Sequence, residues 1–126
     1  MTGGVKDGIA ALIADLHDRG LSKDMLVVIG SEFGRAPRIG DVAPDGRGNW
    51  LTASCIVFAG GGLPMGQIIG ETDWRGEAAR FRPYTSQDIL ATIYHYLGID
   101  HKRTLVDHNG RPQLLVDAGE PINQLA

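Results

Sequence analysis

Two short apolar runs, Met25–Ile29 and Ser54–Ala59, lie in the first half of the chain, and glycine follows each of them. A continuous apolar run without polar alternation is typical of a strand that is buried on both faces of a parallel sheet. We therefore predict a strand at each run. A third segment, Gln67–Gly70, could add a short edge strand.

Helical spacing of apolar residues marks two further segments. In Val5–Arg19 the apolar positions repeat at intervals of three and four, and Gly20 is a suitable end. The second helix begins at the capping-box sequence Thr85-Ser-Gln-Asp88 and ends before Gly98. Its predicted buried stripe consists of Ile89, Leu90, Ile93 and Leu97. Helices that alternate with buried strands predict an α/β fold, with a mostly parallel sheet and flanking helices.

A long segment without a periodic pattern, residues 31–52, separates the two predicted strands. Loops of this length are usually functional or disordered, and ligands of parallel sheets bind beyond the carboxyl ends of the strands. The loop concentrates polar groups and one aromatic residue: Glu32, Arg35, Arg38, Asp41, Asp45, Arg47, Asn49 and Trp50. At the end of a buried strand, Glu32 could bind a hard cation, act as a base, or form an ion pair with Arg35.

Near the C-terminus, turn residues at Asp107–Gly110 separate the short apolar pieces Thr104–Val106 and Gln113–Val116. This arrangement predicts a hairpin-like pair of strands. The lone Cys55 lies inside an apolar run, which predicts a buried thiol without a disulfide partner.

Composition and charge narrow the classes of function. With 126 residues the chain suits one domain, 1–126, and its net charge of −3 argues against general attraction to nucleic acid or membrane surfaces. No apolar run is long enough to span a bilayer, and no export signal follows Met1. The sequence assigns no compartment.

Common cofactor motifs are missing. Gly60-Gly-Gly62 does not continue into the dinucleotide fingerprint, because Met65 occupies the position of its third glycine. We predict a glycine turn there and no nucleotide cofactor. None of the four histidines has the spacing of a zinc motif, so a transition-metal site built from this chain alone is not expected.

Several strings together resemble the DUF1501 family, a set of bacterial proteins of unknown function that is placed near the sulfatases and alkaline phosphatases. They are Ser31-Glu-Phe-Gly-Arg-Ala-Pro37, Gly46-Arg-Gly-Asn-Trp50, Val57-Phe-Ala-Gly-Gly-Gly62, Gly66-Gln-Ile-Ile-Gly-Glu-Thr-Asp73, the segment Arg82–His95, and Gly110-Arg-Pro112. The resemblance implies a partial three-layer sandwich, alkaline-phosphatase-like, with a mostly parallel sheet between helices.

That superfamily uses carboxylates and histidines at the sheet edge to bind divalent metals for hydrolysis of phosphate or sulfate esters. The resemblance therefore implies Glu32 as a ligand of a divalent metal ion. Asn49 would be a second ligand, although the family usually has histidine there and an aspartate where this chain has Gly48. An amide oxygen can bind Ca²⁺ or Mg²⁺ but suits zinc poorly. Arg35 and Arg47 would bind substrate or an oxyanion.

The likeness covers the C-terminal portion of the family, so the nucleophile and the remaining metal ligands are expected in an N-terminal part. We therefore expect a chain that is catalytically incomplete alone and that forms a homodimer or associates with such a part. The alternative is a non-catalytic structural or interaction module, in which Glu32, Arg35 and Trp50 attach the long loop or form a partner surface. The replaced aspartate and histidine favour this alternative.

Overall fold

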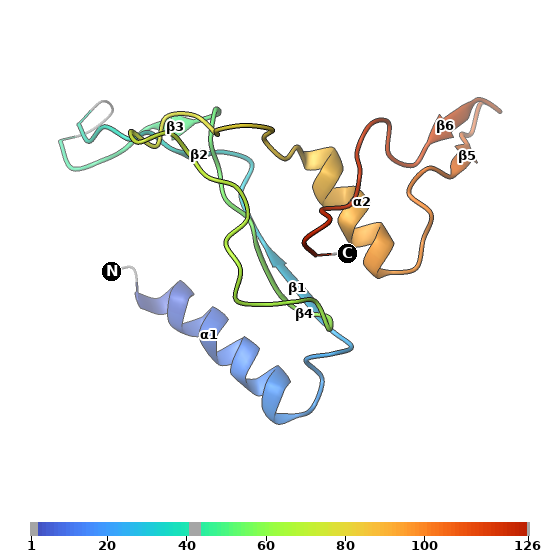
Figure 1. Cartoon of the computed structure of the whole chain (residues 1–126), viewed down its shortest axis with the longest axis horizontal. Coiled ribbons are helices and arrows are strands. Elements are labelled where there is room, and N and C mark those ends of the chain that lie inside the picture. Colours follow the sequence, from blue (N-terminus) through green and yellow to red (C-terminus); the bar gives the residue numbers. More distant parts are fainter. Residues whose placement is uncertain (1–2, 41–43, 126) are drawn as a thin grey trace. The chain divides into compact units, whose positions relative to one another are not determined.

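The computed structural model describes residues 3–40 and 44–125, which form two helices and three two-stranded antiparallel sheets (Figure 1). By their contacts the residues divide into two compact units, the first ending at Phe81 and the second beginning at Arg82. Each unit is described by itself. A single domain over 1–126 stays a prediction.

The first unit begins with helix α1, Gly3–Asp18, which confirms the predicted N-terminal helix. After the helix, the Gly20 N–H donates to the carbonyl of His17, and Gly20 has the positive φ expected of a helix-ending glycine. Only one residue of the apolar stripe is buried, because Leu16 is 8% exposed whereas Val5 is 76% exposed. Most of the predicted core face of α1 therefore remains uncovered.

Strand β1, Leu26–Ile29, pairs with strand β4, Val57–Gly60, so both predicted strands exist. Their pairing is antiparallel, with Leu26 opposite Gly60 and Ile29 opposite Val57, and the two strands lie side by side in Figure 1. The predicted parallel sheet and three-layer sandwich are therefore wrong: within residues 3–40 and 44–125 every strand pair is antiparallel. The edge strand expected at residues 67–70 is also not formed.

The reason lies in the connection between these strands. A parallel pair needs a crossover, usually a helix, that returns the chain to the starting edge of the sheet. Here the connection instead contains a second antiparallel pair, formed by β2, Gly34–Arg35, and β3, Asn49–Trp50. Backbone bonds from Ala36 N–H to Gly48 O (2.8 Å) and from Gly40 N–H to Gly46 O (2.9 Å) continue it. Much of the predicted loop is thus a long hairpin.

The hairpin changes register between its two strand pairs. Residues 30–33 on the outgoing arm lie opposite residues 51–56 on the returning arm, which is therefore longer. At this break Gly34 lies directly against the backbone of Ala53, and a side chain at position 34 would collide with the Ala53 carbonyl. The glycine of the Glu-Phe-Gly-Arg sequence thus allows a close approach of two chain segments. Residues 41–43, including Asp41, lie outside the described residues.

After β4 the chain turns at Gly60, Gly61 and Gly62, which all have positive φ, as the predicted glycine turn requires. Further along, an isolated bridge between Thr72 and Ala79 closes a polar loop. The indole Nε1 of Trp50 donates to the carbonyl of Glu77 at 2.6 Å and ties this loop to β3. Cys55, expected to be buried, is exposed, because the returning arm is covered on neither side at that point.

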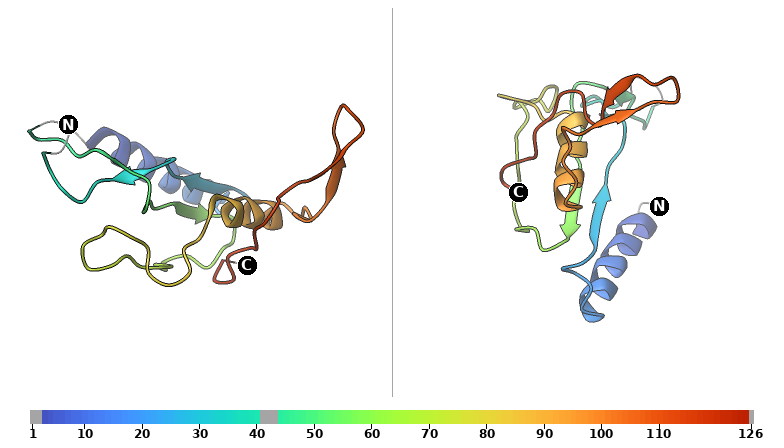
Figure 2. Two further views of the ribbon diagram at one scale, coloured as in Figure 1. Left: turned by 90° about the horizontal axis from the view of Figure 1, so that it is seen from above. Right: turned by 90° about the vertical axis from the view of Figure 1, so that its right-hand side faces the viewer.

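The second unit is built around helix α2, Ser86–Tyr96, and its predicted capping box is confirmed. The Asp88 N–H donates to Thr85 Oγ1 at 3.3 Å, and the Thr85 N–H donates to Asp88 Oδ2 at 2.8 Å. Strands β5, Thr104–Val106, and β6, Pro112–Leu114, form the expected hairpin (Figure 2).

The predicted buried face of α2 is wrong. Its buried residues are Asp88, Ala91 and Thr92, whereas Leu90 is 41% and Leu97 is 57% exposed. The C-terminal segment covers the polar face of α2. There the Glu120 N–H donates to Asp88 and the Ile122 N–H donates to Thr92, so the helix side chains supply acceptors for the backbone of this segment. Val116, Ile122 and Leu125 are buried there with Ala91.

No helix in the part of the chain that the structure describes is long and apolar enough to cross a membrane.

Candidate functional site

The four residues predicted to form a site lie on or beside the β2–β3 hairpin of the first unit. Arg35 on β2 lies directly opposite Asn49 on β3. Arg47 precedes β3, and Glu32 precedes β2. The antiparallel register, which the sequence did not reveal, thus brings together two residues that are far apart along the chain.

The Arg35 guanidinium spans the two arms of the hairpin. Its Nη1 donates to Asn49 Oδ1 at 3.3 Å and to the backbone carbonyl of Arg47 at 3.4 Å. Both hydrogen bonds are long, and both use the same nitrogen. An arginine has five N–H donors, so the Nε and Nη2 donors of Arg35 remain available for a ligand.

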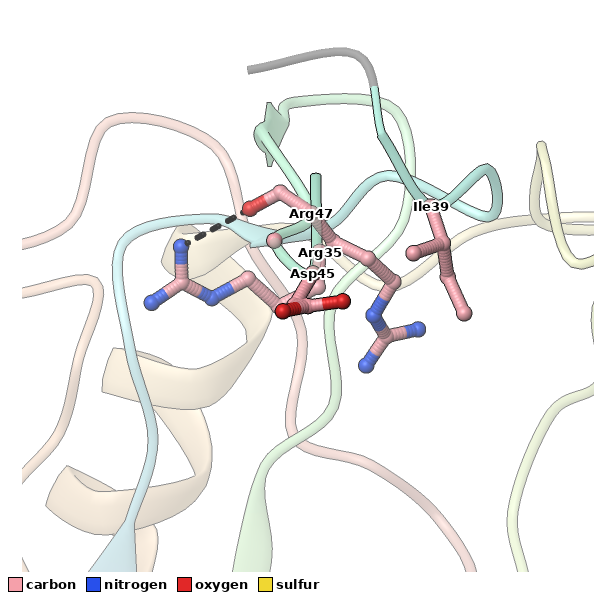
Figure 3. Close-up of a pocket in the computed structure, with 5 residues that line it drawn as sticks. Arg35, Ile39, Asp45 and Arg47 are labelled. Atoms are coloured by element: carbon pink, nitrogen blue, oxygen red, sulfur yellow. Dashed lines mark hydrogen bonds between the residues drawn. The ribbon is translucent and has the colours of Figure 1, made fainter. Parts of the chain in front are cut away.

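An open pocket of about 450 Å³ lies beside this pair and is lined by Arg35, Ile39, Asp45, Gly46 and Arg47. In Figure 3 the guanidinium groups of Arg35 and Arg47 lie on either side of the Asp45 carboxylate, and Ile39 lies beyond Arg47. Within the described residues, neither the Arg47 guanidinium nor the Asp45 carboxylate takes part in a hydrogen bond or ion pair. The pocket therefore holds two cationic groups and one anionic group with free hydrogen-bonding capacity.

Glu32 is exposed and is not among the residues that line the pocket. In the described part of the chain it forms no ion pair with Arg35, so the predicted pair is not formed, whereas Arg35 does bind the loop backbone at the Arg47 carbonyl. The neighbouring Ser31 hydroxyl donates to the Phe33 carbonyl at 2.6 Å and closes a tight turn around Glu32. This turn leaves the carboxylate accessible.

The residues present fit a metal ion poorly at Asn49. Its Oδ1 already accepts a hydrogen bond from the cationic Arg35, and a guanidinium at that distance repels a divalent cation. Among residues 3–40 and 44–125, no group of three or more His, Cys, Asp or Glu side chains could hold a metal ion. Glu32 alone is one ligand and not a site.

Two carboxylates have roles that the sequence patterns did not assign. Asp45 was one polar residue among many in a glycine-rich segment, and only the fold of the hairpin tip places it in the arginine pocket. Asp88 was recognised as a capping residue, but it is also 3% exposed and accepts the Glu120 N–H at 3.1 Å. Burial raises the pKa of Asp88, but hydrogen bonds from Thr85 and Glu120 and the charge of Arg82 outweigh it, so its pKa lies below the ordinary value.

The hairpin carries a small pocket lined by two arginines and one aspartate, and comparison with known proteins places the chain in a family. The chain belongs to DUF1501, described as a protein of unknown function, whose family model matches residues 1–126. No curated protein and no solved structure matches the chain. The placement of the family near the sulfatases and alkaline phosphatases stays a prediction.

Proposed function

We propose that the pocket between Arg35 and Arg47 binds the oxyanion of a phosphate or sulfate ester, as one part of a larger hydrolytic site. The observation that carries this proposal is that two guanidinium groups line a single pocket and have donors to spare. Arginine suits such groups because its planar fork of N–H donors matches the oxygens of phosphate and sulfate.

The two arginines would contribute differently. Arg35 is oriented by two long hydrogen bonds, to Asn49 and to the Arg47 carbonyl, before a ligand arrives. The Arg47 side chain is exposed and unbonded within the described residues, and it can rotate toward an anion that Arg35 holds. This division gives one preorganised contact and one that forms on binding.

We further propose that Glu32 is a ligand of a divalent metal ion whose other ligands come from outside the described residues. Its exposure and its freedom from ion pairs support this role. The proposal assigns no catalytic step to the chain, because a nucleophile and a complete ligand set are not among the residues described here. Hydrolysis would require a second DUF1501 segment.

Isothermal titration with inorganic phosphate and with sulfate tests the oxyanion proposal directly. We expect saturable binding by the unaltered chain and a loss of about tenfold in affinity in Arg35→Gln and in Arg47→Gln, since each removes a charge-assisted contact. Arg103→Gln, an exposed arginine of the second unit, is the matched control and should bind as the unaltered chain does. Equal affinities in all four proteins would contradict the proposal.

A second candidate function is a non-catalytic module, and one observation favours it. Arg35 joins the two hairpin arms, and Trp50 ties the 71–80 loop to the hairpin, so both side chains act as structural links. In this case Arg35→Gln would lower the melting temperature, and neither phosphate nor sulfate would bind to any variant.

We also propose that the uncovered apolar residues are contacted by a second copy of the chain or by another DUF1501 segment. On α1 these are Val5, Leu12 and Ile13, and on and after α2 they are Leu90 and Leu97. Exposed apolar patches of this kind mark interaction sites. Light scattering after size-exclusion chromatography should show a dimer, and Leu12→Gln with Leu90→Gln should return it to a monomer. A monomer at all concentrations would exclude the second copy.

A further inference from the structure

We infer that the pocket selects phosphate or sulfate monoesters that carry a hydroxyl group close to the ester, and that Asp45 determines this specificity. The inference rests on the proposed binding of an oxyanion by Arg35 and Arg47, and it names the class of molecule that the oxyanion belongs to. It comes from a feature that simple anion binding leaves unexplained. A carboxylate lines the pocket together with the two guanidinium groups.

An acidic side chain is unfavourable in a pocket that binds only an anion. A carboxylate repels the ligand oxyanion and offers no donor to it, because it can only accept hydrogen bonds. Asp45 has no partner within the described residues that would neutralise it, and in Figure 3 its carboxylate lies between the two guanidinium groups. A bare phosphate would therefore meet attraction and repulsion in the same place.

A hydroxyl-bearing ester resolves this conflict. Its oxyanion would contact the free donors of Arg35 and the mobile guanidinium of Arg47, and its hydroxyl would donate to Asp45. Ile39, which is 71% exposed and lines the same pocket, offers an apolar contact for the carbon skeleton between the two polar ends. Each kind of group in the pocket then has a counterpart in one small molecule, such as an ester of glycerol or of a sugar.

The experiment compares ligands with one carbon skeleton. The full chain is titrated with glycerol 3-phosphate and with n-propyl phosphate. Both are phosphate monoesters of a three-carbon chain, so a difference in affinity between them reports the effect of the hydroxyl groups. We expect glycerol 3-phosphate to bind about fivefold more tightly, as one hydrogen bond to a charged acceptor allows. A parallel pair, glycerol 3-sulfate and n-propyl sulfate, decides whether the preference holds for both oxyanions or belongs to phosphate alone.

Asp45→Asn identifies the residue responsible. The amide removes the negative charge but keeps the size of the side chain and one acceptor oxygen, so n-propyl phosphate should bind more tightly than in the unaltered chain and the preference for the glycerol ester should weaken. Asp45→Ala removes the acceptor as well, and the preference should then fall to about onefold. Asp7→Asn, an exposed aspartate on α1 far along the chain from the pocket residues, makes the same change in net charge and should leave both affinities unaltered. Circular dichroism spectra of the variants should match that of the unaltered chain.

The outcomes are distinct. Equal affinity for the two phosphate esters in the unaltered chain, or a preference that persists in Asp45→Ala, overturns the role of Asp45 while leaving oxyanion binding intact. If no phosphate or sulfate compound binds to the unaltered chain, the proposed function itself is wrong, and the inference fails with it.

Discussion

The Asp88 carboxylate joins the start of helix α2 to the C-terminal segment, because its Oδ1 accepts the backbone N–H of Glu120 at 3.1 Å while its Oδ2 accepts the N–H of Thr85 at 2.8 Å. Arg82 Nη2 lies 3.5 Å from the same Oδ1. One buried side chain thus caps the start of the helix and holds a segment that lies more than thirty residues away in sequence. Through this relationship Asp88 connects helix α2 with the C-terminal segment of the second unit.

Replacing this carboxylate should destabilise the second unit. Asp88→Ala removes the carboxylate half of the capping box of α2 and leaves the partly buried N–H groups of Thr85 and Glu120 without this acceptor, which together should cost about 2–3 kcal/mol in the free energy of unfolding. Urea unfolding followed by circular dichroism measures this change. Ser86→Ala, at the exposed first position of the helix, is the control and should change the free energy by less than about 0.5 kcal/mol.

The same carboxylate predicts how stability depends on pH. The pKa of Asp88 is lowered in the folded chain, since burial, which raises it, is outweighed by the hydrogen bonds and by Arg82. The unfolded chain therefore takes up the proton first as the pH falls, and folding loses stability. The stability that the Asp88 carboxylate contributes should be fully present above the ordinary aspartate pKa of about 3.9. It should be lost as the pH drops through the lower pKa that Asp88 has in the folded chain.

Glu120 adds to this dependence in the same direction, because its hydrogen bond to Lys102 lowers its pKa as well. Urea midpoints measured between pH 7 and pH 2 should fall in the acid range, and the fall should be smaller in Asp88→Asn. A midpoint that is as sensitive to acid in Asp88→Asn as in the unaltered chain would contradict the assignment to Asp88.

Local sequence signals predicted local structure well. The capping box at Thr85 and Asp88 involves residues three positions apart, and the helix begins where it indicates. The same holds for the turn that follows Val106, where Asp107 Oδ1 accepts the N–H groups of Asn109 and Arg111. In such cases the interacting groups lie within one turn of the chain, so their types and spacing contain the information.

Long-range features were not predictable in the same way. An apolar run such as Met25–Ile29 indicates a strand but not the direction of its partner, which depends on how the intervening chain returns. The pairing of Arg35 with Asn49 follows from that antiparallel return and from the register break at Gly34. Likewise, α2 buries Thr92 instead of Leu90 because a distant segment donates a hydrogen bond to the threonine hydroxyl.

The register break makes Gly34 a sensitive position. Gly34→Ala would place a methyl group against the Ala53 carbonyl, so the two arms must separate, at a cost of about 2 kcal/mol or more. Gly8→Ala is the matched control, because Gly8 lies inside α1 with open space around it. This substitution should stabilise the chain by about 0.5–1 kcal/mol, since alanine favours helix more than glycine does. Thermal unfolding of both variants should shift the melting temperature in opposite directions.

A Gly34→Ala variant as stable as the unaltered chain would show that the arms separate without loss, and the close approach would then not explain this glycine.

The proposed metal ligand is tested by titration with Mg²⁺, Ca²⁺, Mn²⁺ and Zn²⁺ in separate calorimetric experiments. Because the described residues supply only one ligand, we expect heat of binding from at least one cation when a second DUF1501 segment is present with the unaltered chain. This heat should be lost in Glu32→Gln, because the amide keeps the shape of the side chain but lacks the charge that attracts a hard cation. Glu71→Gln is the control, since Glu71 is an exposed carboxylate of the same unit that pairs with Arg80 at 3.4 Å.

Asn49→Ala should also retain the cation binding, because the Asn49 Oδ1 accepts a hydrogen bond from Arg35 and faces a positive charge. If no cation binds when the chain and the second DUF1501 segment are together, Glu32 is not a metal ligand. Binding that survives Glu32→Gln but is lost in Asn49→Ala would instead restore the amide as the ligand and require Arg35 to move.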